Sequence, residues 1–259
     1  MRIVRYRTNR NEAPRWGWVR DDQVGALDGS PFALFKREPP HLALDRVELL
    51  APVEPGKIVC VGRNYAAHAA EHEAPLPELP LLFLKPASAV IGHRQTIRLP
   101  TQSQQVEHEA ELAVIIGEGG RWIAPETAER HILGYTVAND VTARDLQRAD
   151  EQWTRGKGFD TFCPLGPWIE TEFQPADALI SCSVNGHMRQ MASTRDMVFP
   201  VRQLVAYISG IMTLVPGDVI LTGTPSGVGP LAEGDEVTVE IENLGRLTNP
   251  VRAEAAPHP

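Results

Sequence analysis

The amino-acid sequence predicts an α+β fold that is mostly β, with a small β unit at its N-terminus. Three observations support this prediction. Short apolar segments of strand length recur between turn residues, one central segment alternates polar and apolar residues before a β-branched run, and few segments show helical periodicity. The 259 residues suffice for one large domain with a small appendage. We expect a small N-terminal domain and linker over residues 1–54, the main domain over 55–250 and a tail over 251–259.

The central segment is Val106–Gly117, with the sequence VEHEAELAVIIG, and it is predicted to enter the core as a strand. Successive side chains of a strand point to opposite faces, so Glu109 and Glu111 share one face, about 6.6 Å apart along the strand. Two carboxylates this close beside a buried run repel each other unless a proton or a cation lies between them. The alternative is a solvated edge strand whose acids only face water, and residues further along the chain weigh against it.

Composition and charge argue against several classes of partner. The formal charge of −8 argues against nucleic acid and anionic membranes, since both require clustered Lys and Arg. The start, MRIVRYRTNR, lacks the apolar segment of a secretory signal, and no apolar stretch approaches the roughly 20 residues of a membrane helix. Cys60, Cys163 and Cys182 suggest neither a disulfide framework nor a zinc site. A cytoplasmic protein is the simplest interpretation.

The first 50 residues read as short strands at Arg2–Arg7, Trp16–Val19 and Gln23–Leu27, with turn residues between them. This segment contains no residue pattern that indicates chemistry. Its expected role is packing or a dimer surface.

A strand over Lys57–Val61 is followed by a predicted short helix over Tyr65–Glu73, with Asn64 as its N-cap and three prolines after its end. His68 and Glu71 are three residues apart and are therefore neighbours on one helix face. A surface His–Glu pair is common, so this pair alone indicates little.

Two further segments follow the central strand. A helix is predicted from Pro125 to about Ile132, with glutamates at its N-terminal end as the helix dipole favours. The next segment, Gly134–Val141, is an apolar strand with Asp140 near its end. The chain then runs into TARDLQ, where Arg144 and Gln147 are three residues apart.

Lys157 lies in the segment Trp153–Pro164, WTRGKGFDTFCP, which predicts a loop. A lysine between two glycines is unusual for a strand or a helix, because glycine lets the backbone approach another group closely. The segment is not a Walker A loop, since the upstream glycine, the spacing and the following Ser or Thr are missing.

The last third of the chain contains a hairpin, a helix and a glycine-rich loop. Leu179–Val184 is a predicted strand, and Asn185–Gly186 is a strong hairpin signal. Pro200–Leu214 has helical periodicity with one apolar stripe, which indicates core packing. The loop TGTPSGVG, residues 222–229, offers backbone N–H groups and two threonine hydroxyls that suit a carboxylate or a phosphate, with a plain turn as the alternative.

Three acids therefore lie on or at the end of two predicted core strands: Glu109, Glu111 and Asp140. Three buried anions without compensation would cost more free energy than the net stability of a domain. Oxygen ligands without cysteine favour a hard divalent cation, with Mg²⁺ first and Mn²⁺ or Ca²⁺ behind it. Lys157 and Arg144 can offset the remaining negative charge. Three protein ligands leave coordination positions for water and substrate, which is a catalytic arrangement.

These motifs together resemble the fumarylacetoacetate hydrolase superfamily. The resemblance is carried by E-x-E before LAVIIG, by GYTVANDVTARD, by the lysine loop and by TGTPSGVG, and VGRNYAAHAAE is similar to the family's lid. It covers roughly residues 55–250, and the short N-terminal unit resembles that of bacterial members. The resemblance implies the family's mixed β-sandwich roll and a homodimer.

The resemblance also implies roles for individual residues. The implied metal ligands are Glu109, Glu111 and Asp140. The implied substrate-binding residues are Arg144, Gln147 and Thr224. The implied catalytic residues are Lys157 and the lid dyad of His68 and Glu71.

The implied activity is Mg²⁺-dependent cleavage of a C–C bond in a 2-oxo acid or diacid, as in an acylpyruvate or fumarylpyruvate hydrolase. The substrate would chelate the ion through its carboxylate and 2-oxo oxygens, and the ion and Lys157 would stabilise a metal-bound enolate. His68, oriented by Glu71, would deprotonate the attacking water. Because relatives share these motifs, an oxaloacetate decarboxylase and a 2-hydroxyhepta-2,4-diene-1,7-dioate isomerase/decarboxylase of aromatic catabolism are alternatives.

Two hypotheses of another class stand beside an enzyme. A binding module for Mg²⁺ and 2-oxo acids would turn nothing over, but binding alone does not require a base such as His68 or a buried lysine. A purely structural metal site would have a closed coordination shell, whereas only three protein ligands are evident here.

Overall fold

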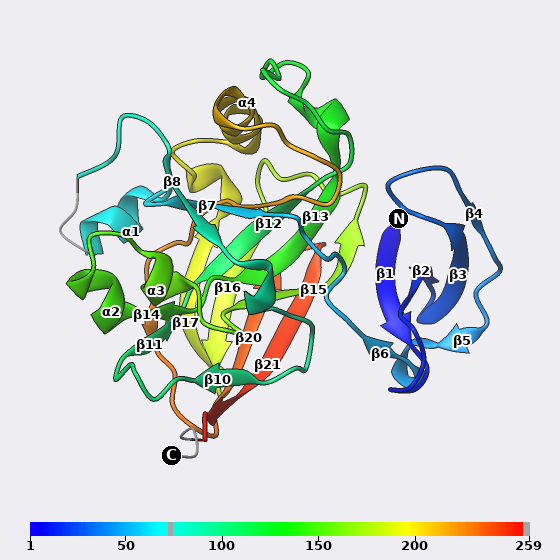
Figure 1. Cartoon of the computed structure of the whole chain (residues 1–259), viewed down its shortest axis with the longest axis horizontal. Coiled ribbons are helices and arrows are strands. Elements are labelled where there is room, and N and C mark those ends of the chain that lie inside the picture. Colours follow the sequence, from blue (N-terminus) through cyan, green and yellow to red (C-terminus); the bar gives the residue numbers. More distant parts are fainter. Residues whose placement is uncertain (72–74, 256–259) are drawn as a thin grey trace.

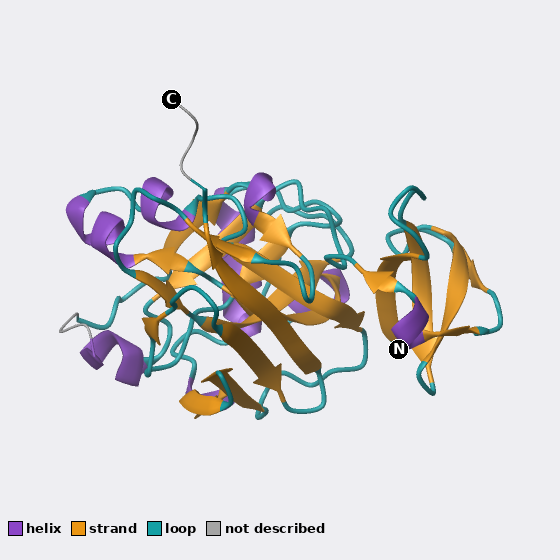
Figure 2. Cartoon of the chain, turned by 90° about the horizontal axis from the view of Figure 1, so that it is seen from below, coloured by secondary structure: helices purple, strands orange, loops and turns teal. Residues whose placement is uncertain are grey.

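The structure is a computed structural model that describes residues 1–71 and 75–255. Strands form most of its regular structure, and Figure 1 shows a small lobe of N-terminal strands beside a larger body. The predicted α+β, mostly β fold is therefore confirmed. Figure 2 shows the same two lobes from below, with most of the helices around the larger one.

The N-terminal lobe is an antiparallel series in the order β4-β3-β2-β1, extended by two short strands. Its β1 pairs with β15 (Cys163–Glu170) of the larger body, with Arg2 opposite Glu170, so one sheet runs through both lobes. The elements of the lobe are β1 (Arg2–Arg7), β2 (Arg15–Arg20), β3 (Gln23–Gly29), β4 (Phe35–Arg37), β5 (Leu42–Ala43), the 3-10 helix η1 (Leu44–Arg46) and β6 (Glu48–Leu49).

The central sheet continues from β15 in the order β13-β12-β18-β7-β8. In β12, Leu112 and Val114 pack into one apolar cluster while Ala113 and Ile115 pack into another on the opposite face. Burial on both faces explains why the polar–apolar alternation ends after Glu111. The strands are β7 (Ile58–Gly62), β8 (Leu81–Lys85), β12 (Ala110–Ile116), β13 (Ile132–Asn139) and β18 (Val219–Leu221), with β9 (Val90–Ile91) added beside β15.

A second sheet packs against β12 and β13 in the order β10-β21-β20-β16-β17. Apolar side chains of both sheets fill the space between them, which gives a two-layer sandwich. Asn185 and Gly186 connect β16 to β17 with φ values of 52° and 77°, as the hairpin signal predicted. The strands are β10 (Ile97–Leu99), β16 (Leu179–Val184), β17 (His187–Ser193), β20 (Glu236–Ile241) and β21 (Gly245–Ala253).

A third, small sheet has the order β14-β11-β19 and lies where the site is built. Its strands are β11 (Val106–His108), β14 (Thr142–Ala143) and β19 (Gly229–Pro230). The predicted strand Val106–Gly117 is thus two strands, because the regular pairing is interrupted at Glu109.

The helices are short and lie mainly at the edges of the sandwich (Figure 1). They are α1 (Ala66–Glu71), α2 (Arg144–Ala149), α3 (Thr154–Lys157), α4 (Val201–Ile211) and the 3-10 helices η2 (Ala87–Ala89), η3 (Ala128–His131) and η4 (Thr194–Asp196). The apolar stripe predicted for α4 is confirmed, since Val201, Leu204, Val205 and Ile208 are buried.

Three local predictions need correction. The helix predicted from Pro125 to Ile132 is only η3, because the chain joins β13 at Ile132. Lys157 ends the short helix α3 instead of lying in a loop. The predicted helix Tyr65–Glu73 begins at Ala66, and its last two residues lie outside the described part of the chain.

The C-terminal strand extends beyond the predicted end of the main domain. Residues Val251, Arg252 and Ala253, placed in the tail by the sequence, belong to β21 and pair with β10. Residues 256–259 of the predicted tail lie outside the described residues. In the described part of the chain, no helix is long and apolar enough to cross a membrane.

Candidate active site and metal centre

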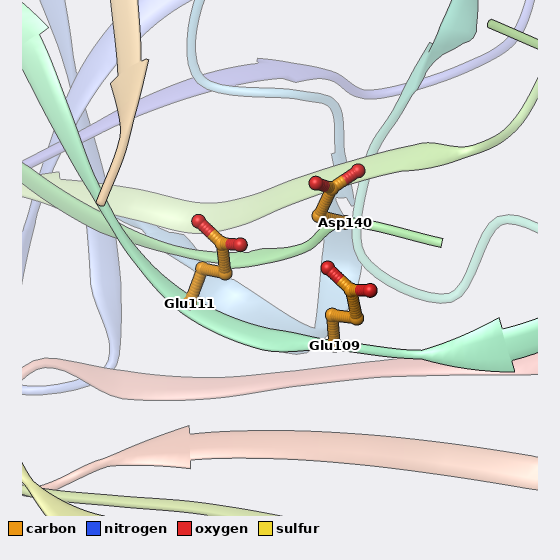
Figure 3. A group of neighbouring side chains, drawn as sticks. All are labelled: Glu109, Glu111 and Asp140. Atoms are coloured by element: carbon orange, nitrogen blue, oxygen red, sulfur yellow. The ribbon is translucent and has the colours of Figure 1, made fainter. Parts of the chain in front are cut away.

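Three buried carboxylates meet where the central and small sheets adjoin. Glu109 lies in the interruption between β11 and β12, Glu111 lies on β12, and Asp140 follows β13. The backbone N–H of Asp140 donates to the Glu109 carbonyl at 2.9 Å, and this hydrogen bond holds the two backbone segments side by side. One carboxylate oxygen from each residue lies within 4.8 Å of the others. Figure 3 shows Glu109 and Glu111 rising from one ribbon toward Asp140, so the predicted shared face is observed.

Buried cations surround two of these acids. Lys157 Nζ lies 2.8 Å from Glu109 Oε2 and 2.7 Å from Asp140 Oδ2. Lys85 Nζ lies 2.6 Å from Asp140 Oδ1, and both side chains have no solvent exposure. Arg144 pairs with Glu109 at 2.5 Å. Glu111 differs, because among the described residues its carboxylate has no ion-pair partner and accepts only from a backbone N–H.

This asymmetry separates the pKa values of the acids. Burial, together with the charges of Asp140 and Glu109, raises the pKa of Glu111 well above its usual value. Burial also acts to raise the pKa of Glu109, but Lys157 and Arg144 outweigh it and hold that pKa well below its usual value. Positive charge is therefore deficient on the Glu111 side of the cluster.

A divalent cation fits this arrangement. The donor set is three carboxylates without nitrogen or sulfur, which suits a hard ion. A cation among them would supply the positive charge that Glu111 lacks. Glu109, Glu111 and Asp140 are thus the residues that could hold a metal, as the sequence predicted.

The glycine-rich loop, residues 222–229, binds the protein's own carboxylates. Gly223 N–H donates to Glu111 Oε2 at 2.7 Å, and Gly227 N–H donates to Glu71 Oε1 at 3.0 Å. Gly223 has a φ of 98°, and a Cβ there would lie 2.7 Å from the Asn64 side chain. Two N–H groups of the loop are therefore used within the protein, and binding of a ligand's carboxylate or phosphate by the rest of the loop stays a prediction.

The predicted dyad lies on α1. His68 Nδ1 is 3.3 Å from Glu71 Oε2, and His68 is only 7% exposed. Burial lowers the pKa of His68, although the Glu109 charge and the Glu71 contact oppose this effect, so the ring is a neutral base at neutral pH. Asn64 does not cap α1 as expected. Its amide instead donates to the carbonyls of Phe199 and Thr222, and this anchors the segment before the helix.

Arg144 connects several residues around the acids. Its guanidinium donates to Glu107 Oε2 at 2.8 Å and to Gln147 Oε1 at 2.6 Å, besides its pair with Glu109. Because α2 begins at Arg144, Gln147 lies one helical turn further on.

Thr224 is oriented by a buried network of hydrogen bonds that the sequence did not reveal. Gln190 Nε2 donates to Thr224 Oγ1 at 2.8 Å, and Gln190 Oε1 accepts from the backbone N–H of Ala110 at 3.0 Å. His108 Nδ1 also lies 3.0 Å from Gln190 Oε1. Since Thr224 Oγ1 already accepts a hydrogen bond, its own proton remains available to donate into the site.

All but one of the predicted site residues line one pocket of about 230 Å³, the exception being Glu71. The walls also include Phe83 and Trp153, whose rings pack edge to face at 5.3 Å, and Lys157 Nζ lies 4.9 Å from the Phe83 ring centre. The lining residues are Val61, Gly62, Arg63, His68, Phe83, Glu109, Glu111, Asp140, Arg144, Gln147, Arg148, Trp153, Lys157 and Thr224.

Sequence reasoning missed three buried polar residues around the pocket: Glu107, Lys85 and Gln190. Glu107 belongs to the same alternating run as Glu109 and Glu111 but lies outside the E-x-E motif. Lys85 carries one signal, a charged residue at the end of the apolar strand LLFLK. Gln190 lies in a hairpin strand that is otherwise mostly exposed, so nothing local marks it.

Comparison with known proteins supports the resemblance. The family model described as Fumarylacetoacetate (FAA) hydrolase C-terminal matches residues 57–252, and the model described as Rv2993c-like, N-terminal matches residues 1–52. Protein Rv2993c of Mycobacterium tuberculosis is 51% identical over 214 residues, covering 82% of this chain and 81% of the relative. Oxaloacetate tautomerase FAHD2B, mitochondrial, of Bos taurus is 48% identical over 225 residues, covering 82% and 72%.

Solved structures show the same fold along nearly the whole chain. The 5-carboxymethyl-2-hydroxymuconate delta-isomerase of Mycobacterium smegmatis is 43% identical with a TM-score of 0.90, and the match covers 98% of this chain and 100% of that one. The maleylpyruvate hydrolase of Sphingobium sp. SYK-6, in complex with manganese(II) ion and pyruvate, is 31% identical with a TM-score of 0.81 at the same coverage.

Proposed function

The chain belongs to the fumarylacetoacetate hydrolase family, and from that premise we propose that it moves protons on a 2-oxo acid through an enolate, as a tautomerase or isomerase. The observation that carries this proposal is that a neutral histidine base, His68, lines the same pocket as the acid triad and Lys157. The tautomerase of Bos taurus and the isomerase of Mycobacterium smegmatis support it, because both names describe proton movement without hydrolysis.

Glu109, Glu111 and Asp140 would hold a divalent cation, which when bound supplies a Lewis acid for the oxygens of a 2-oxo acid. The remaining steps belong to side chains of this chain. The identity of the ion, with Mg²⁺ expected from the sequence, is part of the proposal.

His68 acts as the general base. The Glu71 carboxylate accepts the Nδ1 proton, which leaves Nε2 with the lone pair that takes a proton from the carbon next to the 2-oxo group. The electron pair of that C–H bond becomes the C=C bond of an enolate, and the carbonyl electrons move to oxygen. Protonation of the oxygen completes a tautomerisation, whereas protonation further along an unsaturated chain completes an isomerisation.

Lys157 and Thr224 act on the negative charge that develops. Burial acts to lower the pKa of Lys157, but the charges of Asp140 and Glu109 outweigh it and raise that pKa, so the ammonium is charged when substrate binds. The free hydroxyl proton of Thr224 can donate to a substrate oxygen. Arg144 and Gln147 form the wall that would bind the substrate carboxylate.

Hydrolysis of a C–C bond is the second candidate, as the sequence first indicated. The His68–Glu71 pair favours it, because the same base can deprotonate a water that attacks a distal carbonyl. Decarboxylation of oxaloacetate would require no base at all.

The expected homodimer also stays a prediction, which sedimentation of the purified protein would test.

One set of assays separates these reactions. The ultraviolet absorbance of the enol reports tautomerisation of oxaloacetate, loss of acetylpyruvate reports hydrolysis, and CO₂ release reports decarboxylation. We expect His68→Gln to lower the rate of tautomerisation at least about 100-fold, within the range for a lost general base. Tautomerisation that survives in His68→Gln, with hydrolysis lost, would favour the hydrolase. Absence of all three activities in the metal-loaded wild type would favour a binding module.

A further inference from the structure

The backbone of Glu109 lies at the break between two strands. β11 ends at His108 and β12 begins at Ala110, so regular strand pairing is interrupted at the residue that carries the first acid of the triad. Glu109 and Ala110 are both buried, and a buried N–H group without an acceptor costs about 1–3 kcal/mol. The N–H groups of these two residues do have acceptors, but each acceptor is a side chain instead of a neighbouring strand.

Asn139 is the last residue of β13 and holds the Glu109 N–H. Its Oδ1 accepts from that N–H at 2.9 Å, and the residue is 1% exposed. Asp140, the next residue, donates its own N–H to the Glu109 carbonyl at 2.9 Å. Two consecutive residues therefore hold both polar groups of the Glu109 backbone. Because one of them is itself a triad acid, these bonds fix Glu109 relative to Asp140.

Gln190, on β17, holds the Ala110 N–H. Its Oε1 accepts from that N–H at 3.0 Å, and the residue is 1% exposed. Its Nε2 donates to Thr224 Oγ1 and to the Pro225 carbonyl, each at 2.8 Å. A reversed amide would place its own N–H groups against the Ala110 N–H, so these hydrogen bonds permit one orientation of the side chain. Gln190 thereby joins the start of β12 to the glycine-rich loop.

The loop that Gln190 holds also binds the second glutamate of the triad. In that loop, the Gly223 N–H donates to Glu111 Oε2 at 2.7 Å. Ala110, whose N–H Gln190 accepts, lies between Glu109 and Glu111 in the sequence. A single amide therefore connects the backbone between the two glutamates to the loop that holds the Glu111 carboxylate.

Amide side chains suit these two positions because they are neutral. The oxygen of Asn or Gln accepts a hydrogen bond without carrying a charge. An ionised Asp or Glu at either position could accept the same bond, but it would add another buried anion beside Glu109, Glu111 and Asp140, and burial of such a charge is costly. The two amides can therefore orient the acids without adding to their negative charge.

We propose that Asn139 and Gln190 are positioning residues of the metal centre. Both act through the backbone and the loop that hold the glutamates, and they set the spacing of the carboxylate oxygens that would ligate the ion. Groups that orient metal ligands tune the affinity of a site even though they do not touch the ion. This inference rests on the part of the proposed function that places a divalent cation at the triad, and it is independent of the reaction.

The test measures the affinity of metal-free protein for Mn²⁺ alone, without substrate or turnover. Electron paramagnetic resonance detects the free ion and so gives the Kd. Asn139→Leu and Gln190→Met keep roughly the size of each side chain and remove its acceptor oxygen. We expect each variant to weaken Mn²⁺ binding about 10- to 100-fold, the range for groups that orient metal ligands. Stabilisation by Mn²⁺ against urea should fall in parallel, and where one variant does not fold the other decides.

Asn249→Leu is the matched control. Asn249 is also 1% exposed, and its amide also bonds to the backbone, by donating to the carbonyls of Gly92 and Gln95. Those carbonyls lie between β9 and β10, in a segment that carries no triad acid. The control should lose unfolding free energy, as the two site variants do, but its Kd for Mn²⁺ should be that of the wild type.

Three results would contradict the proposal. An unchanged Kd in a folded variant overturns the role of that residue, and an equal loss of affinity in Asn249→Leu overturns both roles. Wild-type protein that does not bind Mn²⁺ overturns them together with the metal centre. Mn²⁺ binding by a wild type that catalyses none of the three reactions would instead reject only the proposed activity, and a selective loss in the two variants would still support the positioning roles.

Discussion

Two ion pairs of similar length in this molecule differ in what surrounds them. Arg7 and Glu48 pair at 2.7 Å in the N-terminal lobe, with side chains 23% and 35% exposed. Lys85 and Asp140 pair at 2.6 Å in the candidate site, with no exposure of either side chain. Exposed pairs contribute about 0–1 kcal/mol, whereas a buried charge that loses its partner has no solvent to replace it. Equal geometry therefore does not imply equal energetic weight.

The comparison also distinguishes the uses of charge in the two lobes. The N-terminal lobe has ion pairs near solvent that join one base to one acid, such as Arg5 with Glu54. The site instead concentrates acids beyond the number of buried bases, and Glu111 is the triad acid that has no cationic partner among the described residues. Such an excess of buried negative charge is unfavourable unless an added cation neutralises it. This is the physical basis for proposing a metal at the triad.

The largest effect is expected from removing one triad acid. Glu111→Gln, Glu109→Gln or Asp140→Asn should each lower kcat/KM by about 10³-fold or more, because a catalytic ion supplies several kcal/mol and each 1.4 kcal/mol is tenfold. Mg²⁺ should raise the melting temperature of the wild type but not of these variants, since a ligand of the folded state stabilises it by mass action. Full activity after chelation of metal would contradict the assignment.

The difference between the buried Lys85–Asp140 pair and the exposed Arg7–Glu48 pair is tested by removing the base of each pair. Lys85→Met should lower the free energy of unfolding by about 3 kcal/mol in metal-free protein, the low end of the range for a broken buried pair, because Asp140 loses Lys85 but keeps Lys157. Arg7→Met, the matched control in the N-terminal lobe, should cost at most about 1 kcal/mol. Urea unfolding of the two variants measures the difference. An equal loss of unfolding free energy in the two variants would show that burial does not determine how much each ion pair contributes to stability.

Lys157→Met tests whether a buried cation has a catalytic role besides neutralising acids. We expect kcat to fall about 10²- to 10³-fold, the range for loss of one group that stabilises developing negative charge. Stabilisation by Mg²⁺ should persist, since the triad is intact. A change in KM alone would mean that Lys157 only recruits the anionic substrate.

An effect confined to acidic pH is expected at His93, a half-buried group between the two extremes. Burial, with a contribution from the Arg94 charge, lowers the pKa of His93 to about 4. Its unfolded pKa is about 6.5, so the unfolded chain binds more protons between these values and stability falls as pH falls from about 6.5 to about 4. His93→Asn keeps an acceptor for the Thr248 N–H. Its unfolding free energy should fall less over that window, and an identical pH profile would exclude this contribution.

The sequence by itself determined the features that depend on neighbours along the chain. The alternation at Glu109 and Glu111, the Asn185–Gly186 turn and the stripe of α4 each follow from local backbone geometry, which has a fixed period. The helix predicted after Pro125 failed for the opposite reason, because pairing of β13 with β12 took the residues from Ile132 onward. Tertiary contacts override local preference when they satisfy more backbone groups.

Only the tertiary structure decided how the charges of the site are partnered. Lys85 and Asp140 are 55 residues apart, and Glu111 and Gly223 are 112 residues apart. Nothing in the local sequence specifies such contacts, because they arise when β8, β13 and the loop after β18 are brought together by strand order. The sequence could therefore identify the acids that form a cation site. Which of these acids lacks an ion-pair partner in the described part of the chain depended on packing in three dimensions.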